Sequence, residues 1–298
     1  MLHERVRLGD ITRSAIDHYA KQLAHHGWCV IPDAMPRASV DALDRDLSTT
    51  FEETPYCEGG FYGARTKRFG RLLGRSRHAA AFVQHEVILG VSKRMLAPWC
   101  DTIQLNLTQA IAIHPGALPQ LPHRDQDMWC GEIGRTEYLI NVMWPFTDYT
   151  AENGATLIWP GSHGAHALEA EPSASPMIVT MRPGAALMFL GSTLHGAGGN
   201  TSDAERRGMI VSYCLGWLKT YENQFLAYPP PIARQFSPDL AALVGYCQHR
   251  PNLGNFEGRC PSILFDNDVP ATPGAIDALR PDQVAMVEAF VEGQRRQR

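Results

Sequence analysis

The first hundred residues carry apolar side chains at helical spacing. Apolar positions three and four residues apart predict helices over residues 10–26, 39–47 and 79–97. A short apolar stretch, Trp28–Ile31, predicts a strand that Pro32 ends. We therefore expect residues 1–100 to form a mainly helical layer that supports the rest of the chain.

From about residue 101 the apolar period changes from helical to strand-like. Ile103, Leu105 and Leu107 alternate with polar residues, and Asn153-Gly154 is a turn signal between two later strands. Further strands are predicted over 138–144, 155–159, 177–181, 185–190 and 209–218. Many short strands separated by Gly and Pro are typical of a β-sandwich or jelly roll. The helices should cover one outer face of this core, residues 101–220.

The remaining residues, 221–298, have a different composition. A proline-rich stretch, Tyr228–Pro231, lies among scattered aromatic residues, and a last helix is predicted over 281–295. Long irregular segments in compact proteins are usually lids or binding loops. We expect this tail to close the substrate side of the core or to contact a second copy, in a chain of one domain. The alternative is an outer covering without substrate contact.

Composition narrows the class of protein. The 298 residues are 44% hydrophobic and 19% charged, with a formal charge of −4. Neither a basic run that would indicate nucleic acid nor an apolar run long enough for a membrane helix is present. The N-terminal residues 1–7 lack an apolar signal core, so we expect a cytoplasmic protein. Seven cysteines without a Cys-x-x-Cys pair indicate reduced thiols.

The candidate chemistry lies in the stretch Pro122–Trp129. His123 and Asp125 are two residues apart, so in a strand both side chains would point to one face. A second imidazole, His195, lies at the end of an apolar strand that could fold back beside them. Two imidazoles and one carboxylate leave coordination positions open, as in non-haem Fe(II) oxygenases. A surface turn is the alternative for the His-x-Asp pair alone.

A basic, glycine-rich region over residues 54–77 is harder to interpret. It contains Arg65, Lys67, Arg68, Arg71, Arg75 and Arg77. A solvated charged surface is the expected explanation for most of these residues, with one or two reaching an anionic ligand.

Three blocks together resemble the phytanoyl-CoA dioxygenase family of Fe(II)- and 2-oxoglutarate-dependent oxygenases, over roughly residues 15–220. The blocks are His123-Arg124-Asp125 with Trp129, the stretch 152–156 continuing to 160–163, and the stretch 194–202 followed by Arg206-Arg207. The resemblance implies a double-stranded β-helix, that is, a cupin-like jelly-roll barrel. It also implies oxidation of an unactivated C–H bond, by default hydroxylation, with Fe(II), 2-oxoglutarate and O2.

The resemblance also implies roles for single residues. His123, Asp125 and His195 correspond to the iron ligands. An arginine about eleven residues after the distal histidine holds the far carboxylate of 2-oxoglutarate, which selects Arg206, or Arg207 if the loop is one residue longer. The weaker correspondences are Thr156, Gln120 and Arg65 around 2-oxoglutarate and Trp129 beside the substrate.

The substrate is the least determined part. Aromatic residues near the expected mouth indicate a bulky apolar molecule such as a terpenoid or another natural product; they are Phe61, Tyr62, Trp129, Phe225 and Tyr228. The basic region keeps an acyl-CoA hydroxylase open. A non-catalytic jelly-roll binding protein and a zinc hydrolase on a similar barrel are the rivals from other classes. A homodimer is a further expectation.

Overall fold

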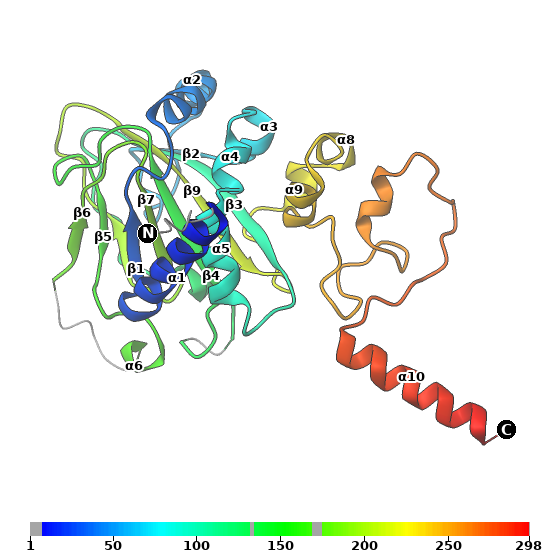
Figure 1. Ribbon diagram of the computed structural model, residues 1–298. Coiled ribbons are helices and arrows are strands. Elements are labelled where there is room, and N and C mark those ends of the chain that lie inside the picture. The colour runs from blue at the N-terminus through cyan, green and yellow to red at the C-terminus, as the bar shows by residue number, and fades with distance from the viewer. Residues whose placement is uncertain (1–7, 132–133, 169–174, 298) are drawn as a thin grey trace, which may run out of the picture.

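The computed structural model describes residues 8–131, 134–168 and 175–297, and it consists of two facing antiparallel sheets, flanking helices and an extended tail (Figure 1). The first seven residues, on which the expectation about a signal core rests, lie outside this range. The jelly-roll class expected from the strand pattern is confirmed, although the two sheets face each other and are not joined into a closed barrel.

The larger sheet has six strands and lies between the helices and the smaller sheet. Its strands run in the order β1-β7-β4-β9-β3-β2, and every neighbouring pair is antiparallel. Their bounds are β1 Trp28–Ile31, β2 Thr66–Phe69, β3 Ile103–Ile113, β4 Leu139–Pro145, β7 Ala186–Leu190 and β9 Arg206–Leu215. The smaller sheet has the order β6-β5-β8, with β5 Thr156–Ile158, β6 Met177–Val179 and β8 His195–Ala197.

The alternation of side chains along each strand separates two apolar cores. On β9, Ile210 points between the two sheets, whereas its neighbours Met209 and Val211 point to the helices. The inter-sheet core includes Leu187 and Phe189 of β7. This inner layer is where the polar site is embedded.

The N-terminal helices cover the outer face of the larger sheet, as expected. Leu23, Leu43 and Ile88 are fully buried in the outer core. The helices are α1 Leu8–His26, α2 Arg37–Glu53, α3 Leu72–Arg75, α4 Ala79–Val83 and α5 Glu86–Leu96. Their apolar faces meet the outward side chains of the sheet, so the helical layer holds the wall that carries the site.

Two local predictions are corrected. The helix expected over 79–97 is two helices, because His85 leaves the helical conformation and its ring accepts a hydrogen bond from the Ile88 N–H, which caps α5. The region 54–77, expected to be irregular, contains β2, which pairs with β3 at the sheet edge. The turn at Asn153-Gly154 forms as expected, with Gly154 at φ +92°.

The tail contains more short helices than the sequence indicated. It has α7 Gln224–Ala227, α8 Pro230–Ala233, α9 Pro238–Leu243, a 3-10 helix η2 Pro261–Phe265, and α10 Pro281–Arg296. Two further short elements lie between strands of the region 101–220; they are η1 Asp125–Met128 and α6 Ala165–Leu168. No helix in the described ranges has the length and apolarity needed to cross a bilayer.

Candidate metal centre and its pocket

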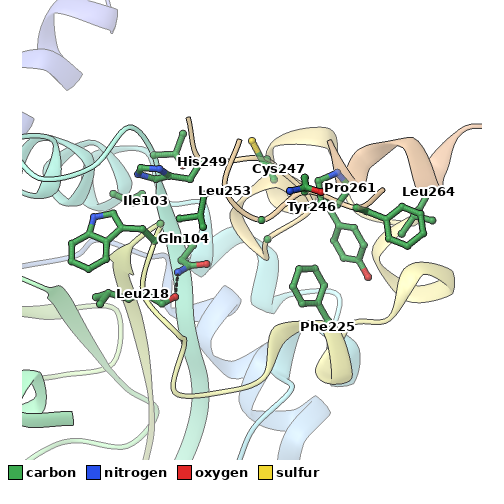
Figure 2. A pocket seen from close by; sticks show the side chains of 18 of the residues that line it. Ile103, Gln104, Leu218, Phe225, Tyr246, Cys247, His249, Leu253, Pro261 and Leu264 are labelled. Carbon is green, nitrogen blue, oxygen red and sulfur yellow. Dashed lines mark hydrogen bonds between the residues drawn. The ribbon is translucent and has the colours of Figure 1, made fainter. Parts of the chain in front are cut away.

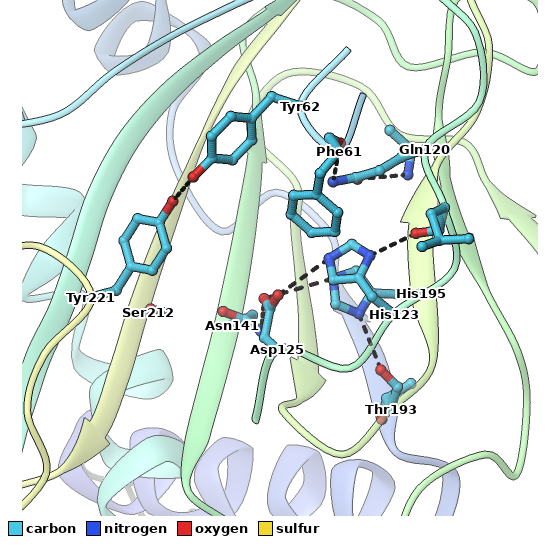
Figure 3. A network of polar contacts seen from close by, with 12 residues as sticks. Phe61, Tyr62, Gln120, His123, Asp125, Asn141, Thr193, His195, Ser212 and Tyr221 are labelled. Atoms are coloured by element: carbon cyan, nitrogen blue, oxygen red, sulfur yellow. Dashed lines mark hydrogen bonds and ion pairs between the residues drawn. The ribbon is translucent and has the colours of Figure 1, made fainter. Parts of the chain in front are cut away.

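His123, Asp125 and His195 converge as the sequence predicts (Figure 3). One ligand atom from each residue lies within 4.8 Å of the others. Nε2 of His123 is 3.3 Å from Oδ1 of Asp125, and Nε2 of His195 is 3.7 Å from Oδ2. The three donor atoms therefore surround one point, which is the geometry that a single metal ion requires.

The backbone explains why the two histidines meet. His123 and His195 form an isolated antiparallel bridge, with N–O distances of 2.9 and 3.0 Å in its two hydrogen bonds. Asp125 is not on a strand, contrary to the expectation. It begins η1, and this turn brings its carboxylate back to the two rings. His123 in an extended bridge and Asp125 at the start of a 3-10 turn therefore converge without the strand periodicity that the sequence suggested.

Neighbouring groups fix the orientation of all three ligands. Nδ1 of His123 lies 2.9 Å from the Leu121 carbonyl oxygen, and Nδ1 of His195 lies 3.1 Å from that of Thr193. Each ring thus donates from Nδ1 to a carbonyl and presents Nε2 to the centre. The Asn141 side chain donates to Oδ2 of Asp125 at 2.9 Å. Such outer partners are typical of metal sites.

The ionisation states of Asp125 and His195 suit a cation. Burial opposes ionisation of Asp125, but the two imidazoles and Asn141 outweigh it and hold the pKa of this carboxyl at about 2. Burial lowers the pKa of His195, so its imidazole is neutral near pH 7. A carboxylate and a neutral imidazole are the protonation states that bind metals.

The triad opens into a cavity between the two sheets. Arg206, Thr156 and Gln120 also line this cavity. Arg206 is only 1% exposed, its guanidinium lies 3.6 Å from the centre of the Tyr149 ring, and its Nε and Nη2 find no hydrogen-bond partner among the described residues. A buried guanidinium with unused N–H donors beside a cavity can bind an anion that enters the cavity.

Arg207 points the opposite way. Successive residues of β9 face opposite sides of the sheet, so Arg207 lies on the helical side. Its Nη2 is 2.8 Å from Oδ2 of Asp44 in α2, and Nε is 3.5 Å from Glu205. Of the two arginines that the sequence left open, only Arg206 faces the cavity.

The structure brings Arg68 to the cavity, and not Arg65. The Nε of Arg65 donates to the Pro115 carbonyl oxygen at 2.6 Å, in an adjoining outer cavity. Arg68 lines both cavities, its Nη1 donates to Gln109 at 3.2 Å, and its buried Nε has no partner in the described part of the chain. In the sequence, only its place in the basic region pointed to this residue.

Aromatic residues border the entrance to the site. The Phe61 ring packs edge-to-face on the His123 ring with centroids 4.8 Å apart. The hydroxyl groups of Tyr62 and Tyr221 are hydrogen-bonded to each other (Figure 3). The Arg68 guanidinium lies over the Tyr62 ring at 5.1 Å. Phe61 and Tyr62 were expected near the mouth, whereas Tyr221 was not singled out in the sequence.

Three expected substrate contacts are not at the cavity. Tyr228 is fully buried in the outer core, where its hydroxyl contacts Thr108 at 3.1 Å. Phe225 lines a separate apolar pocket in the tail, and Trp129 packs on the outer core while its indole donates to the Lys219 carbonyl oxygen. The positions of Phe225 and Tyr228 correct the expectation that this part of the tail closes the metal mouth.

The sequence and the fold of this chain are similar to those of known proteins. The model of the phytanoyl-CoA dioxygenase (PhyH) family matches residues 23–208. The chain belongs to the phytanoyl-CoA dioxygenase family. The curated relatives of this PhyH chain are dioxygenases. They include dioxygenase swnH2 of Arthroderma benhamiae, 27% identical with 87% of each chain covered, and multifunctional dioxygenase ausE of Aspergillus calidoustus, 29% identical with 79% of this chain and 85% of that one covered.

Solved structures support the fold assignment of this PhyH protein. The epimerase SnoN from nogalamycin biosynthesis superposes with a TM-score of 0.56 at 18% identity, covering 68% of this chain and 84% of that one. EctD from S. alaskensis with bound Fe gives 0.55 at 16% identity, covering 69% and 78%. The family resemblance, the jelly-roll class and the dioxygenase class inferred from sequence are thereby confirmed.

Proposed function

We propose that this dioxygenase holds Fe(II) on His123, Asp125 and His195 and uses 2-oxoglutarate and O2 to oxidise an unactivated C–H bond of an apolar natural product, such as a terpenoid. The triad is the observation that carries the proposal. Two imidazoles and one carboxylate are the donor set of non-haem Fe(II) oxygenases and leave positions open for co-substrates. When bound, the iron would activate O2, the oxidant of the reaction, and 2-oxoglutarate would supply two of the four electrons that O2 accepts.

Arg206 is the proposed partner of the far carboxylate of 2-oxoglutarate. Its unused Nε and Nη2 provide the planar pair of donors that a carboxylate accepts. Thr156 lines the same cavity and is proposed to donate its hydroxyl to that carboxylate. Arg68 and Gln120 are proposed to complete the polar lining around 2-oxoglutarate. Arg68 has there the role that the family resemblance suggested for Arg65.

The proposed substrate lies in the outer cavity beside the centre. This cavity has a volume of about 460 Å³, which suits a small organic molecule. It shares Arg68 and Gln120 with the metal cavity and is lined by the glycine-rich loop 59–64, which carries Phe61 and Tyr62. Apart from Arg65 and Arg68 the lining is uncharged, and its aromatic residues favour an apolar substrate held close to the iron.

The basic region gives little support to an acyl-CoA substrate. Lys67 donates to the backbone carbonyl oxygens of Phe51 and Glu52, and Arg75 donates to that of Gly70. Arg68 points inward instead of toward solvent. These cations do not form one phosphate-binding surface, so we favour the natural-product substrate over the acyl-CoA alternative.

A turnover screen tests the proposal directly. Protein with Fe(II), 2-oxoglutarate and O2 is incubated with panels of terpenoids, amino-acid derivatives and acyl-CoA thioesters, and succinate and oxidised products are measured by mass spectrometry. We expect substrate-stimulated succinate formation with the apolar panel. Activity with acyl-CoA alone would favour the alternative substrate. No 2-oxoglutarate consumption with any panel would favour a binding protein, and hydrolysis with Zn(II) would favour a hydrolase.

We further propose a homodimer and a cytoplasmic location. All seven cysteines are unpaired thiols, which suits a reducing compartment. An apolar surface on the tail supports self-association and is considered next.

A further inference from the structure

The C-terminal helix α10 presents an apolar face that nothing in the described chain covers. Met286 is 70% exposed and Phe290 is 66% exposed, and Val284, Val287 and Val291 continue the same face. Charged residues, including Glu288 and Glu292, lie on the opposite face. None of the described residues of α10 is buried, and Figure 1 shows the helix projecting away from the rest of the molecule.

Such a helix needs a partner. Isolated helices of this length are only marginally stable in water, and most helices in proteins are stabilised by packing an amphipathic face. A continuous apolar stripe left in water would also be a liability for solubility. The sequence of α10 therefore indicates that its apolar face is covered in solution.

The tail also contains an open apolar pocket of about 540 Å³ (Figure 2). It lies between the ends of β3 and β9 and the segment that carries α9 and η2, and none of the metal-triad residues lines it. Its lining is mostly aliphatic and aromatic and comprises residues such as Ile103, Leu218, Phe225, Tyr246, Leu253 and Leu264. Phe225 and Leu253 are about half exposed, at 51% and 48%.

We propose that two copies of this chain exchange their C-terminal helices, so that α10 of each copy occupies the apolar pocket of the other. The pocket and the helix are matched in chemistry, since both are apolar and both lack a partner in the described residues. The connecting segment, 266–280, contains no buried residue and carries α10 outward from its own pocket. A second copy is thus the partner that both surfaces fit.

A two-fold arrangement forms the same contact twice, so both α10 faces and both pockets are covered in one dimer. This contact does not depend on the metal centre, so its failure would leave the proposed oxygenase activity untouched.

The wild type and three variants test the exchange by light scattering coupled to size-exclusion chromatography. The full-length wild-type protein should be a dimer at micromolar concentration. Phe290→Asp on the apolar face of α10 and Leu253→Asp in the pocket should each give a monomer. Ala289→Asp places the same charge on the opposite face of α10 and should remain a dimer. Thermal unfolding of each variant confirms that the fold is retained.

Mixing distinguishes exchange from other arrangements. An equimolar mixture of the Phe290→Asp and Leu253→Asp proteins can rebuild one of the two contacts, so part of it should return to the dimer. A monomeric wild type would overturn the proposal, as would a Phe290→Asp protein that stays dimeric. A dimer lost with Phe290→Asp but kept with Leu253→Asp would show that the helices pair with each other, which also contradicts exchange.

Discussion

The metal cavity and the tail pocket are two hollows of opposite character. The metal cavity holds a carboxylate, two imidazoles, the buried Arg206 and the half-buried Arg68, and several of its polar atoms lack partners in the described residues. The tail pocket is larger and mostly apolar. Unused buried donors and acceptors reduce stability, so a protein retains them where a ligand uses them. Unsatisfied polar atoms, and not size, therefore distinguish the metal cavity as the candidate site.

Removing a metal ligand should produce the largest effect. Asp125→Ala leaves two imidazoles without the anionic donor, so Fe(II)-dependent turnover should fall below detection while the fold persists. Asp127→Ala is the matched control, because Asp127 lies in the same short helix η1 but is exposed. Succinate formation measures both. Retained activity in Asp125→Ala would contradict the assignment of the triad.

The next largest effect should separate two adjacent arginines. Losing one partner of a buried charge pair costs about 3–5 kcal/mol, so Arg206→Gln should weaken 2-oxoglutarate binding by at least about a hundredfold. Arg207→Gln removes an ion pair with Asp44 on the helical side and should leave that affinity within about threefold. Calorimetric titration reports both values.

The same two substitutions should affect the unfolding free energy in the reverse order, with the larger loss in Arg207→Gln. Arg206 is a buried cation without a carboxylate partner in the described chain, so Arg206→Gln should preserve or raise the unfolding free energy of the ligand-free protein. Arg207→Gln should lower it, because Asp44 would lose its cation. If Arg207→Gln weakened 2-oxoglutarate binding and Arg206→Gln did not, the assignment would be reversed.

Arg68 and Arg65 offer a smaller contrast at the junction of the two cavities. A hydrogen bond to a charged group is worth about 1.5–3 kcal/mol, so Arg68→Gln should raise the 2-oxoglutarate concentration for half-maximal rate roughly ten- to a hundredfold. Arg65→Gln should change it little, since the Arg65 Nε donates to a backbone carbonyl in the outer cavity. Equal effects of the two substitutions would argue against a distinct role for Arg68.

A buried carboxyl behind the centre should affect stability rather than activity. Burial raises the pKa of Glu137 to about 7, although Ser192 donates to both of its oxygens. The folded protein therefore keeps this proton up to about pH 7, whereas the unfolded chain loses it near pH 4.5.

The unfolding free energy should accordingly decrease between about pH 4.5 and 7, by up to about 3 kcal/mol from this group. Glu137→Gln cannot ionise, and its amide can still hydrogen-bond to Ser192. Denaturant titrations across this pH range should show a smaller decrease for the variant. Identical slopes would mean that Glu137 is ionised in the folded protein.

The sequence predicted most of the elements and the three side chains that converge as candidate metal ligands, because periodicity and local motifs carry that information. It could not choose between Arg206 and Arg207, since the choice depends on which face of β9 lies toward the second sheet. The family resemblance selected Arg65, whereas Arg68 stood in a charged stretch that was expected to be mostly a solvated surface. Only the pairing of β2 with β3 turns Arg68 inward.

The tail shows a different limit of sequence reasoning. Its aromatic residues indicated correctly that the segment is not a free linker, and Tyr228 is indeed fully buried. Composition does not specify which surface a segment covers, however. Phe225 and Tyr228 pack on the side of the helices and of the tail pocket, away from the lining of the metal cavity.

The most direct test of the proposed centre is an anaerobic calorimetric titration of 2-oxoglutarate into the wild-type protein, with and without Fe(II). The geometry of the triad and Arg206 predicts about one molecule bound per chain in the presence of Fe(II), and much weaker binding to the metal-free protein. An Fe(II)-loaded protein that did not bind 2-oxoglutarate would contradict the proposed centre, as would a metal-free protein that bound it equally well.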